Sequence, residues 1–165
     1  REGMIAAIFH ILSHAATKAL LFVSAMGLRD VSGGSKRFID LTGAGYRNVL
    51  AGVGFTVGAL SMVGIPLFSG FVSKLLFGQA ALINQGKMLP TLIVLAISTV
   101  LNAIYFMKTV IRIYTKEDTE YSTINELKHP NYTIAITLFI VLNLVLGLAS
   151  EPILGLVETG LVMFE

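Results

Sequence analysis

The stretch from Met4 to Met26, MIAAIFHILSHAATKALLFVSAM, is apolar apart from two histidines, one lysine and a few small polar residues. A helix needs about 20 mainly apolar residues to cross a hydrocarbon core of about 30 Å. The stretch has that length, and no acidic residue or proline interrupts it. It therefore predicts a transmembrane helix that carries three ionisable side chains.

The composition of the whole chain indicates an integral membrane protein. Of its 165 residues, 55% are hydrophobic and 13% are charged, whereas a soluble domain carries about 25% charged residues. The formal charge of +2 gives no indication of nucleic acid as a partner. The sequence has no cysteine, which excludes disulfides, thiolate metal sites and iron–sulfur ligation by these residues. The sequence contains neither a Ser-His-Asp arrangement nor a phosphate-binding loop, the motifs that would indicate a soluble enzyme.

We expect an all-α, polytopic transmembrane helix bundle of about five spans, forming a single membrane domain over residues 1–165. The expected spans are about 4–27, 49–65, 69–83, 89–114 and 132–149. Pro66 separates the second span from the third, which is short and is expected to be an interrupted helix near Lys74. Gly54 and Gly58 have the spacing that lets helices approach closely in lipid.

Basic residues between the spans give the expected topology. Five spans would place two groups on opposite sides of the membrane: Arg29, Lys36, Arg37, Arg47 and Lys87 on one, and Arg1, Arg112, Lys116 and Lys128 on the other. The first group is slightly larger, so the linker that holds most of it is expected in the cytoplasm. Because a span follows almost directly after Arg1 without the features of a secretory signal, we expect the chain to be a piece of a longer protein.

The three ionisable residues of the first span are His10, His14 and Lys18. Residues four apart lie on one face of a helix, about 6 Å apart along its axis, so they form a polar stripe. Ionisable groups inside a membrane are costly and usually mark an ion or proton pathway. Histidine titrates near neutral pH, and like charges this close repel, so protonation of one group opposes protonation of the next. The stripe is typical of a proton relay, with Ser13 and Thr17 expected to help hold water.

Other interpretations of these residues stay open at this point. The stripe could be structural, with the histidines bonding a neighbouring helix. A metal site at His10 and His14 is disfavoured because Lys18 repels cations. Lys74 is equally well interpreted as an anchor that reaches the headgroups or as a buried functional lysine. Lys108, one turn before Arg112, fits interfacial anchoring better than proton transfer.

Two motifs together resemble a known family. HILSHAATKALLF begins at His10 and resembles the pattern H-x-x-x-H-A-x-x-K-A-L-L-F, and GIPLFSGFVSK ends at Lys74 and resembles G-[IF]-P-P-x-x-G-F-x-[SG]-K. These patterns are found in the antiporter-like membrane subunits of respiratory complex I (NADH-quinone oxidoreductase), in the large subunits of multi-subunit Na⁺/H⁺ antiporters, and in the membrane subunits of energy-converting hydrogenases. The resemblance runs from His10 to about Tyr114.

The resemblance implies roles for the residues that match. His10, His14 and Lys18 would lie on a central proton-conducting axis, and Lys74 would be the terminal proton-exchange residue on an interrupted helix. Lys108 is a weaker candidate for the same path. Leu67 replaces the second proline of the family pattern, which we expect to change turn stiffness. Leu75 replaces an acidic residue found in some members, so Lys74 needs a counter-charge from elsewhere.

The function implied is proton translocation by the C-terminal part of a membrane subunit in a redox-driven translocase. No cofactor is expected in this chain. The expected partners are other membrane subunits, the lipid bilayer, and protons or Na⁺, and the expected location is a bacterial or archaeal inner membrane. A Na⁺/H⁺ antiporter without redox chemistry is one alternative. A membrane scaffold that transports nothing is another, and it would bury the stripe in a dry contact.

Overall fold

The computed structural model describes residues 1–83, 85–116 and 130–162, and all regular structure in these ranges is helical. The helices are α1 (Glu2–Asp30), η1 (Phe38–Leu41), α2 (Ala44–Arg47), α3 (Val49–Val63), α4 (Ser69–Ile83), α5 (Gln85–Ile113), α6 (Pro130–Leu148) and α7 (Glu151–Val162). Three segments are long and apolar enough to cross a membrane: Glu2–Asp30, Gly86–Ile113 and Asn131–Leu148. The chain is therefore an all-α transmembrane bundle, as predicted.

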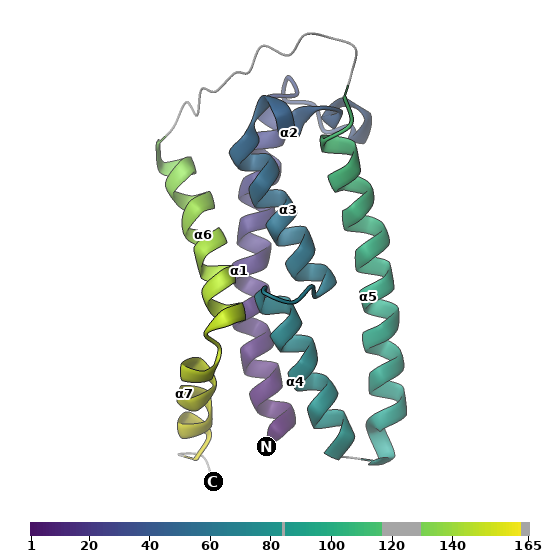
Figure 1. Cartoon of the computed structure of the whole chain (residues 1–165), viewed down its shortest axis with the longest axis vertical. Coiled ribbons are helices and arrows are strands. Elements are labelled where there is room, and N and C mark those ends of the chain that lie inside the picture. Colours follow the sequence, from purple (N-terminus) through teal and green to yellow (C-terminus); the bar gives the residue numbers. More distant parts are fainter. Residues whose placement is uncertain (84, 117–129, 163–165) are drawn as a thin grey trace.

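Two shorter apolar helices, α3 and α4, form one interrupted passage. Each has 15 residues, or about 22 Å at 1.5 Å per residue, which is less than the hydrocarbon core of about 30 Å. Figure 1 shows α4 continuing from the end of α3 in the same direction, with α5 returning beside both. The expected ranges 49–65 and 69–83 are thus both helical, but they lie end to end rather than side by side.

The break between α3 and α4 follows from its sequence. Gly64 adopts a left-handed conformation with φ of 89°, and its N–H and that of Ile65 bond back to the carbonyls of Ser61 and Leu60, both at 3.0 Å. This is the Schellman arrangement that ends a helix at glycine. Leu67 has φ of 91°, which proline cannot adopt because its ring fixes φ near −65°. The change from the family proline therefore alters the path of the turn, not only its stiffness.

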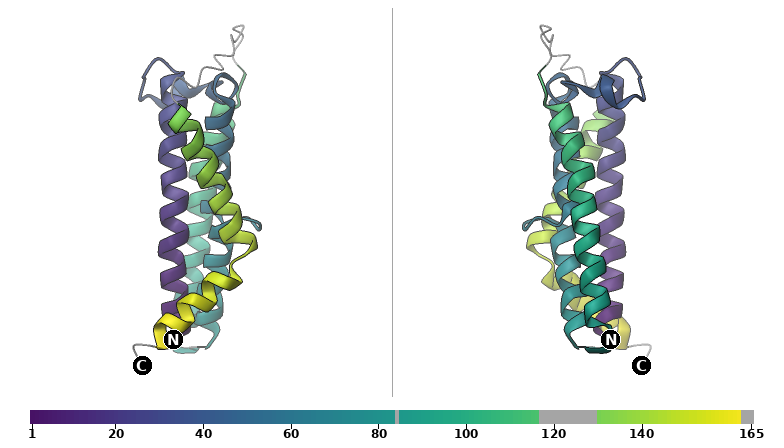
Figure 2. Two further views of the ribbon diagram at one scale, coloured as in Figure 1. Left: turned by 90° about the vertical axis from the view of Figure 1, so that its left-hand side faces the viewer. Right: turned by 90° about the vertical axis from the view of Figure 1, so that its right-hand side faces the viewer.

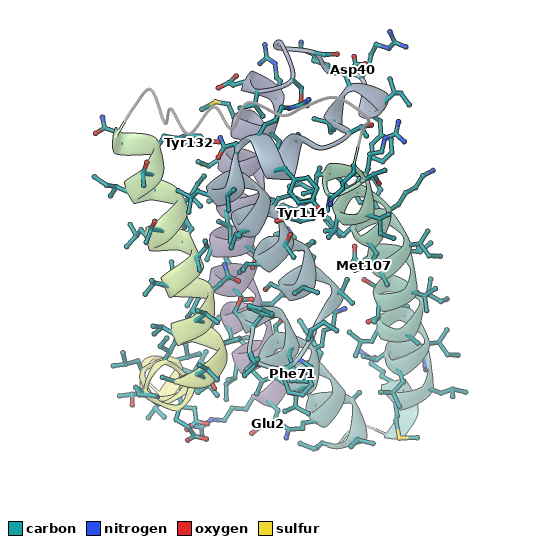
Figure 3. The ribbon with its side chains drawn as sticks, turned by 45° about the horizontal axis from the view of Figure 1, so that its top comes forward. Glu2, Asp40, Phe71, Met107, Tyr114 and Tyr132 are labelled. Carbon is teal, nitrogen blue, oxygen red and sulfur yellow. The ribbon has the colours of Figure 1, made fainter. Side chains whose placement is uncertain are left out.

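Small residues let α1, α3 and α6 pack closely. A Cβ atom on Gly58 would lie 2.8 Å from the side chain of Leu21, which confirms the close approach predicted from the glycine spacing. A Cβ on Gly27 would overlap the hydroxyl of Tyr132, labelled in Figure 3, which donates to the carbonyl of Val23. Large apolar side chains remain exposed along the outer helices, as expected of a lipid-facing surface.

The interrupted passage changes the topology expected from the sequence. Because α3 and α4 cross only once, Lys87 lies at the opposite end of the bundle from the linker between α1 and α3, and Arg112 lies at the same end as that linker (Figures 1 and 2). Lys128 falls outside the described residues. We call the end that carries most of the charge the basic end; its cations are Arg29, Lys36, Arg37, Arg47, Arg112 and Lys116. At the opposite end lie only Arg1 and Lys87 among the terminal cations of the described residues, so the positive-inside rule predicts that the basic end faces the cytoplasm.

A labelling experiment checks this topology. In the full-length protein freed of accessible cysteines, Lys36→Cys and Lys87→Cys should react with a membrane-impermeant maleimide from opposite sides, because both side chains are exposed at opposite ends of the bundle. Lys36→Cys should be labelled from the cytoplasm. Labelling of both positions from one side would support the five separate spans and contradict the interrupted passage.

Candidate functional site

The broken end of α3 provides the first part of the site. The last four carbonyls of a helix lack partners within it, and in lipid each unsatisfied group costs several kcal/mol. The turn at Gly64 satisfies Leu60 and Ser61. The carbonyl of Met62 accepts from Asn102 Nδ2 on α5 at 3.4 Å. The fourth carbonyl is left for a side chain of α4.

That side chain is Lys74. Its Nζ donates to the carbonyl oxygen of Val63 at 2.7 Å and to Thr99 Oγ1 on α5 at 2.8 Å. Thr99 gives its own hydrogen to the carbonyl of Leu95, so its oxygen is free to accept. The C-terminus of a helix carries a partial negative charge that stabilises a cation. The end of α3 thus supplies the counter-charge that the sequence lacks at Leu75.

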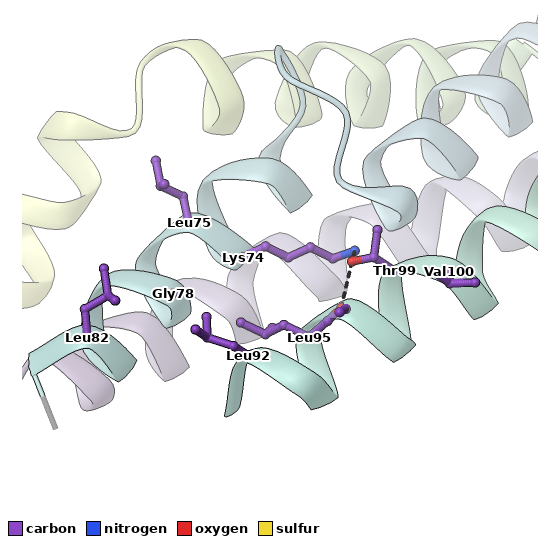
Figure 4. A pocket seen from close by; sticks show the side chains of 9 residues that line it. Lys74, Leu75, Gly78, Leu82, Leu92, Leu95, Thr99 and Val100 are labelled. Carbon is purple, nitrogen blue, oxygen red and sulfur yellow. Dashed lines mark hydrogen bonds between the residues drawn. The ribbon is translucent and has the colours of Figure 1, made fainter. Parts of the chain in front are cut away.

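A cavity of about 560 Å³ lies beside Lys74 between α4 and α5. Figure 4 shows the lysine stretching along its edge to Thr99. The other lining residues are apolar: Leu75, Gly78, Leu82, Leu92, Leu95, Ala96 and Val100. Lysine has three N–H donors, and the two protein acceptors take two of them. The third N–H has no protein acceptor among the described residues, and the cavity borders the side chain that carries it.

The stripe on α1 reaches α4 beside this lysine. His10 Nδ1 lies 2.7 Å from Ser73 Oγ, and the rings of His10 and His14 have centroids 5.3 Å apart. Lys18 follows His14 by one turn of α1, about 6 Å along the helix axis, and Lys74 directly follows Ser73 on α4. The structure therefore brings the residues predicted from the two motifs into one row.

Ser13 and Thr17 differ from expectation. Each is 2% exposed, and their hydroxyls bond Ser69 Oγ and Asn143 Oδ1, both at 2.9 Å, instead of facing water. The expectation that they hold water is wrong, because α4 and α6 cover this face of α1. Asn143 was missed; the signal available was its position as an amide in the apolar run of the last span.

Lys108 lies apart from the other predicted residues. It is exposed on α5, about 13 Å along the helix from Thr99, and its Nζ lies 5.9 Å from the centre of the Phe38 ring. Arg112 lies over the same ring. This contact with η1, in the linker at the basic end, supports interfacial anchoring. Among the described residues, no three metal-ligating side chains come together that could hold an ion.

Comparison with known proteins places these features in a family. Residues 1–102 match the family described as NADH:quinone oxidoreductase/Mrp antiporter, transmembrane. NADH-quinone oxidoreductase subunit N of Rhodococcus opacus is 27% identical over all 165 residues, which cover 30% of that relative. The subunit N of Mycobacteroides abscessus is 30% identical over 70% of this chain and 21% of its own length.

Antiporter subunits match as well. The putative antiporter subunit mnhA2 of Staphylococcus aureus is 30% identical over 134 residues, or 75% of this chain and 16% of that protein. The chain thus spans less than a third of the length of the curated relatives it matches. These relatives include both subunits named for quinone reduction and subunits named for antiport.

Proposed function

The chain belongs to the NADH:quinone oxidoreductase/Mrp antiporter transmembrane family, and from that premise we propose that it forms a proton half-channel in a membrane subunit of a redox-driven pump. One observation carries the proposal. The ammonium of Lys74 is held at the broken end of α3 by Val63 and Thr99, and the same segment of α4 contacts the α1 stripe through Ser73 and His10.

The row of groups can pass protons because its members cannot all be charged together. At the 5.3 Å that separates the two histidine rings, two positive charges repel by about 3 kcal/mol at an effective dielectric constant near 20. A proton that arrives at one imidazole therefore favours release from the next. Since His10 Nδ1 is directed to Ser73, its Nε2 is the nitrogen left to exchange protons along the stripe.

Lys74 is the terminal group in this scheme. When protonated, it bonds the Val63 carbonyl and Thr99 and benefits from the negative end of α3. Lys74 directly follows Ser73, the partner of His10, and like charges on neighbouring groups repel, so a proton arriving on the stripe promotes release from Lys74 into the adjoining cavity. In this scheme, protons released by Lys74 leave through the cavity between α4 and α5.

The relatives support a proposal about partners and location. The matched proteins are named as subunits, so we propose that this chain works with other membrane subunits in a bacterial inner membrane, with protons as the transported ion. The antiporter relatives favour a second candidate, Na⁺/H⁺ exchange without redox chemistry. It would use the same lysines, but it would need Na⁺.

Lys18→Met tests the role of the stripe. In the full-length protein, within its native complex in proteoliposomes, this change should slow proton translocation at least about tenfold, because methionine cannot hold a proton. A pH-sensitive dye measures the rate, and Lys36→Met is the matched control because Lys36 is exposed at the basic end. Unchanged translocation would refute the relay. Wild-type transport that persists without Na⁺ supports the redox pump, and transport that stops supports the antiporter.

A further inference from the structure

The cavity between α4 and α5 has the properties of a ligand site as well as those of an outlet. Its volume of about 560 Å³ lies within the range of about 300–1,000 Å³ that is typical of small-molecule pockets. Of its nine lining residues, only Lys74 and Thr99 have polar side chains. Leu82 and Val100 line the cavity and are also 60% and 57% exposed on the outside of the bundle. The cavity is therefore open to the apolar phase around the helices.

The polar end of this cavity lies deep in the membrane. Thr99 is the middle residue of α5, which runs from Gln85 to Ile113, and the Lys74 ammonium donates to Thr99 at 2.8 Å. At 1.5 Å per residue, the middle of α5 is about 21 Å from either end of the helix. Phospholipid headgroups stay at the membrane surface and do not reach this depth. A ligand at this site must therefore be an amphiphile whose head enters the interior of the bilayer.

The ammonium of Lys74 favours an acidic head group. Two of its three N–H groups donate to the Val63 carbonyl and to Thr99, and the third has no protein acceptor among the described residues. Within the same ranges, no carboxylate forms an ion pair with Lys74. Thr99 has no hydrogen to offer, because it donates to the Leu95 carbonyl. Charge complementarity therefore favours a carboxylate over a neutral or cationic head group.

The hydrocarbon chain of such a ligand would fill the cavity without adding much selectivity. Lipid tails are as apolar as leucine side chains, so a chain that moves from the bilayer into the cavity gains little free energy. A hydrogen bond between charged groups is about twice as strong as one between neutral groups, and the low dielectric constant of the surroundings strengthens it. Recognition therefore depends on the head group.

From this geometry we propose that the cavity binds a free fatty acid of the membrane, with its carboxylate on Lys74 and its chain along Leu82, Leu92 and Leu95. The acid moves through the lipid in its neutral form, because a charge there is costly. At the site its O–H bond breaks and an N–H bond forms on the neutral amine of Lys74, so the resulting pair has no net charge. This step rests on the proposed function, because it needs the form of Lys74 that has released its proton. The bound acid holds Lys74 protonated and fills the outlet, so it inhibits translocation.

Photolabelling of the full-length protein in its complex tests the proposal. Proteoliposomes without substrate for turnover are irradiated with palmitic acid that carries a diazirine in its chain, and the labelled peptides are identified by mass spectrometry. Labelling is measured instead of proton flux, because fatty acids themselves carry protons across a bilayer. The cavity-lining parts of α4 and α5 should be labelled at least fivefold more than the exposed side of α6 around Leu138.

Competition tests the choice of head group. Unlabelled palmitic acid should compete at least tenfold better than its methyl ester, which has the same chain but cannot ionise. Equal competition by the ester would overturn the proposal, as would labelling of α4 and α5 no higher than that of α6.

Two glycine variants separate the cavity from the lipid-facing surface. Gly78→Phe places a ring in the cavity, because a Cβ atom at Gly78 meets nothing within 4 Å, and it should lower labelling of α4 and α5 at least fivefold. Gly155→Phe on α7 is the matched control, since Gly155 is equally open but does not line the cavity. Persistent labelling in Gly78→Phe would overturn the proposal. Wild-type translocation without labelling of the cavity would overturn this inference alone, whereas labelling without translocation would contradict only the proposed function.

Discussion

Replacing Lys74 with arginine in the full-length protein should abolish proton translocation while leaving the assembled complex nearly as stable as wild type. Arginine keeps the positive charge and can donate to the Val63 carbonyl and to Thr99, so the broken end of α3 stays satisfied. It remains protonated under all working conditions, so it cannot release a proton into the cavity. Loss of a group that exchanges protons costs about a hundredfold or more in rate.

Lys74→Met completes this test. It should be equally inactive but less stable, because the Val63 carbonyl loses its donor in a partly buried setting, at a cost of about 1–3 kcal/mol. Lys87→Met is the matched control, since Lys87 is an exposed lysine at the start of α5 and should translocate normally. Translocation is followed with a pH-sensitive dye, and stability by thermal unfolding of the complex. An arginine variant that pumps at the wild-type rate would show that Lys74 supplies only charge.

The helices could be predicted from the sequence because membrane insertion selects long apolar runs, such as the one around His10 and His14. The end-to-end placement of α3 and α4 could not. Gly64 and Pro66 mark a break, but a break alone does not say whether the chain turns back or continues. That choice depends on how the freed carbonyls of α3 find partners on α4 and α5, which is decided by tertiary contacts.

The candidate site was predictable to a similar degree. Ionisable residues in a membrane are few, so His10, His14, Lys18 and Lys74 stand out on cost alone. The two acceptors of Lys74 could not be predicted, because a backbone carbonyl and a threonine form no recognisable sequence motif. Serine and asparagine are also tolerated in many helices, so the hydrogen bonds of Asn143 become evident only when α1, α4 and α6 are brought together.

The packing of the break makes Gly70 the most sensitive glycine for a stability test. A Cβ atom there would overlap the backbone carbonyl of Ser61, and that backbone cannot move aside without disturbing the bond from Gly70 N–H to Ser61 Oγ. Gly70→Ala should therefore destabilise the protein by about 3 kcal/mol or more, the upper range for overpacking. We expect poor assembly of the complex, measured by native gel and by thermal unfolding.

Gly78 offers a control on the same helix. A Cβ atom at Gly78 would meet nothing within 4 Å, because the residue faces the cavity beside Lys74. Gly78→Ala should leave assembly intact and can stabilise α4 by up to about 1 kcal/mol through its higher helix propensity. The contrast separates contact at the break from a general intolerance of α4 to side chains. If Gly70→Ala were as stable as Gly78→Ala, α3 and α4 could not meet as closely as the Gly70–Ser61 and Lys74–Val63 hydrogen bonds require.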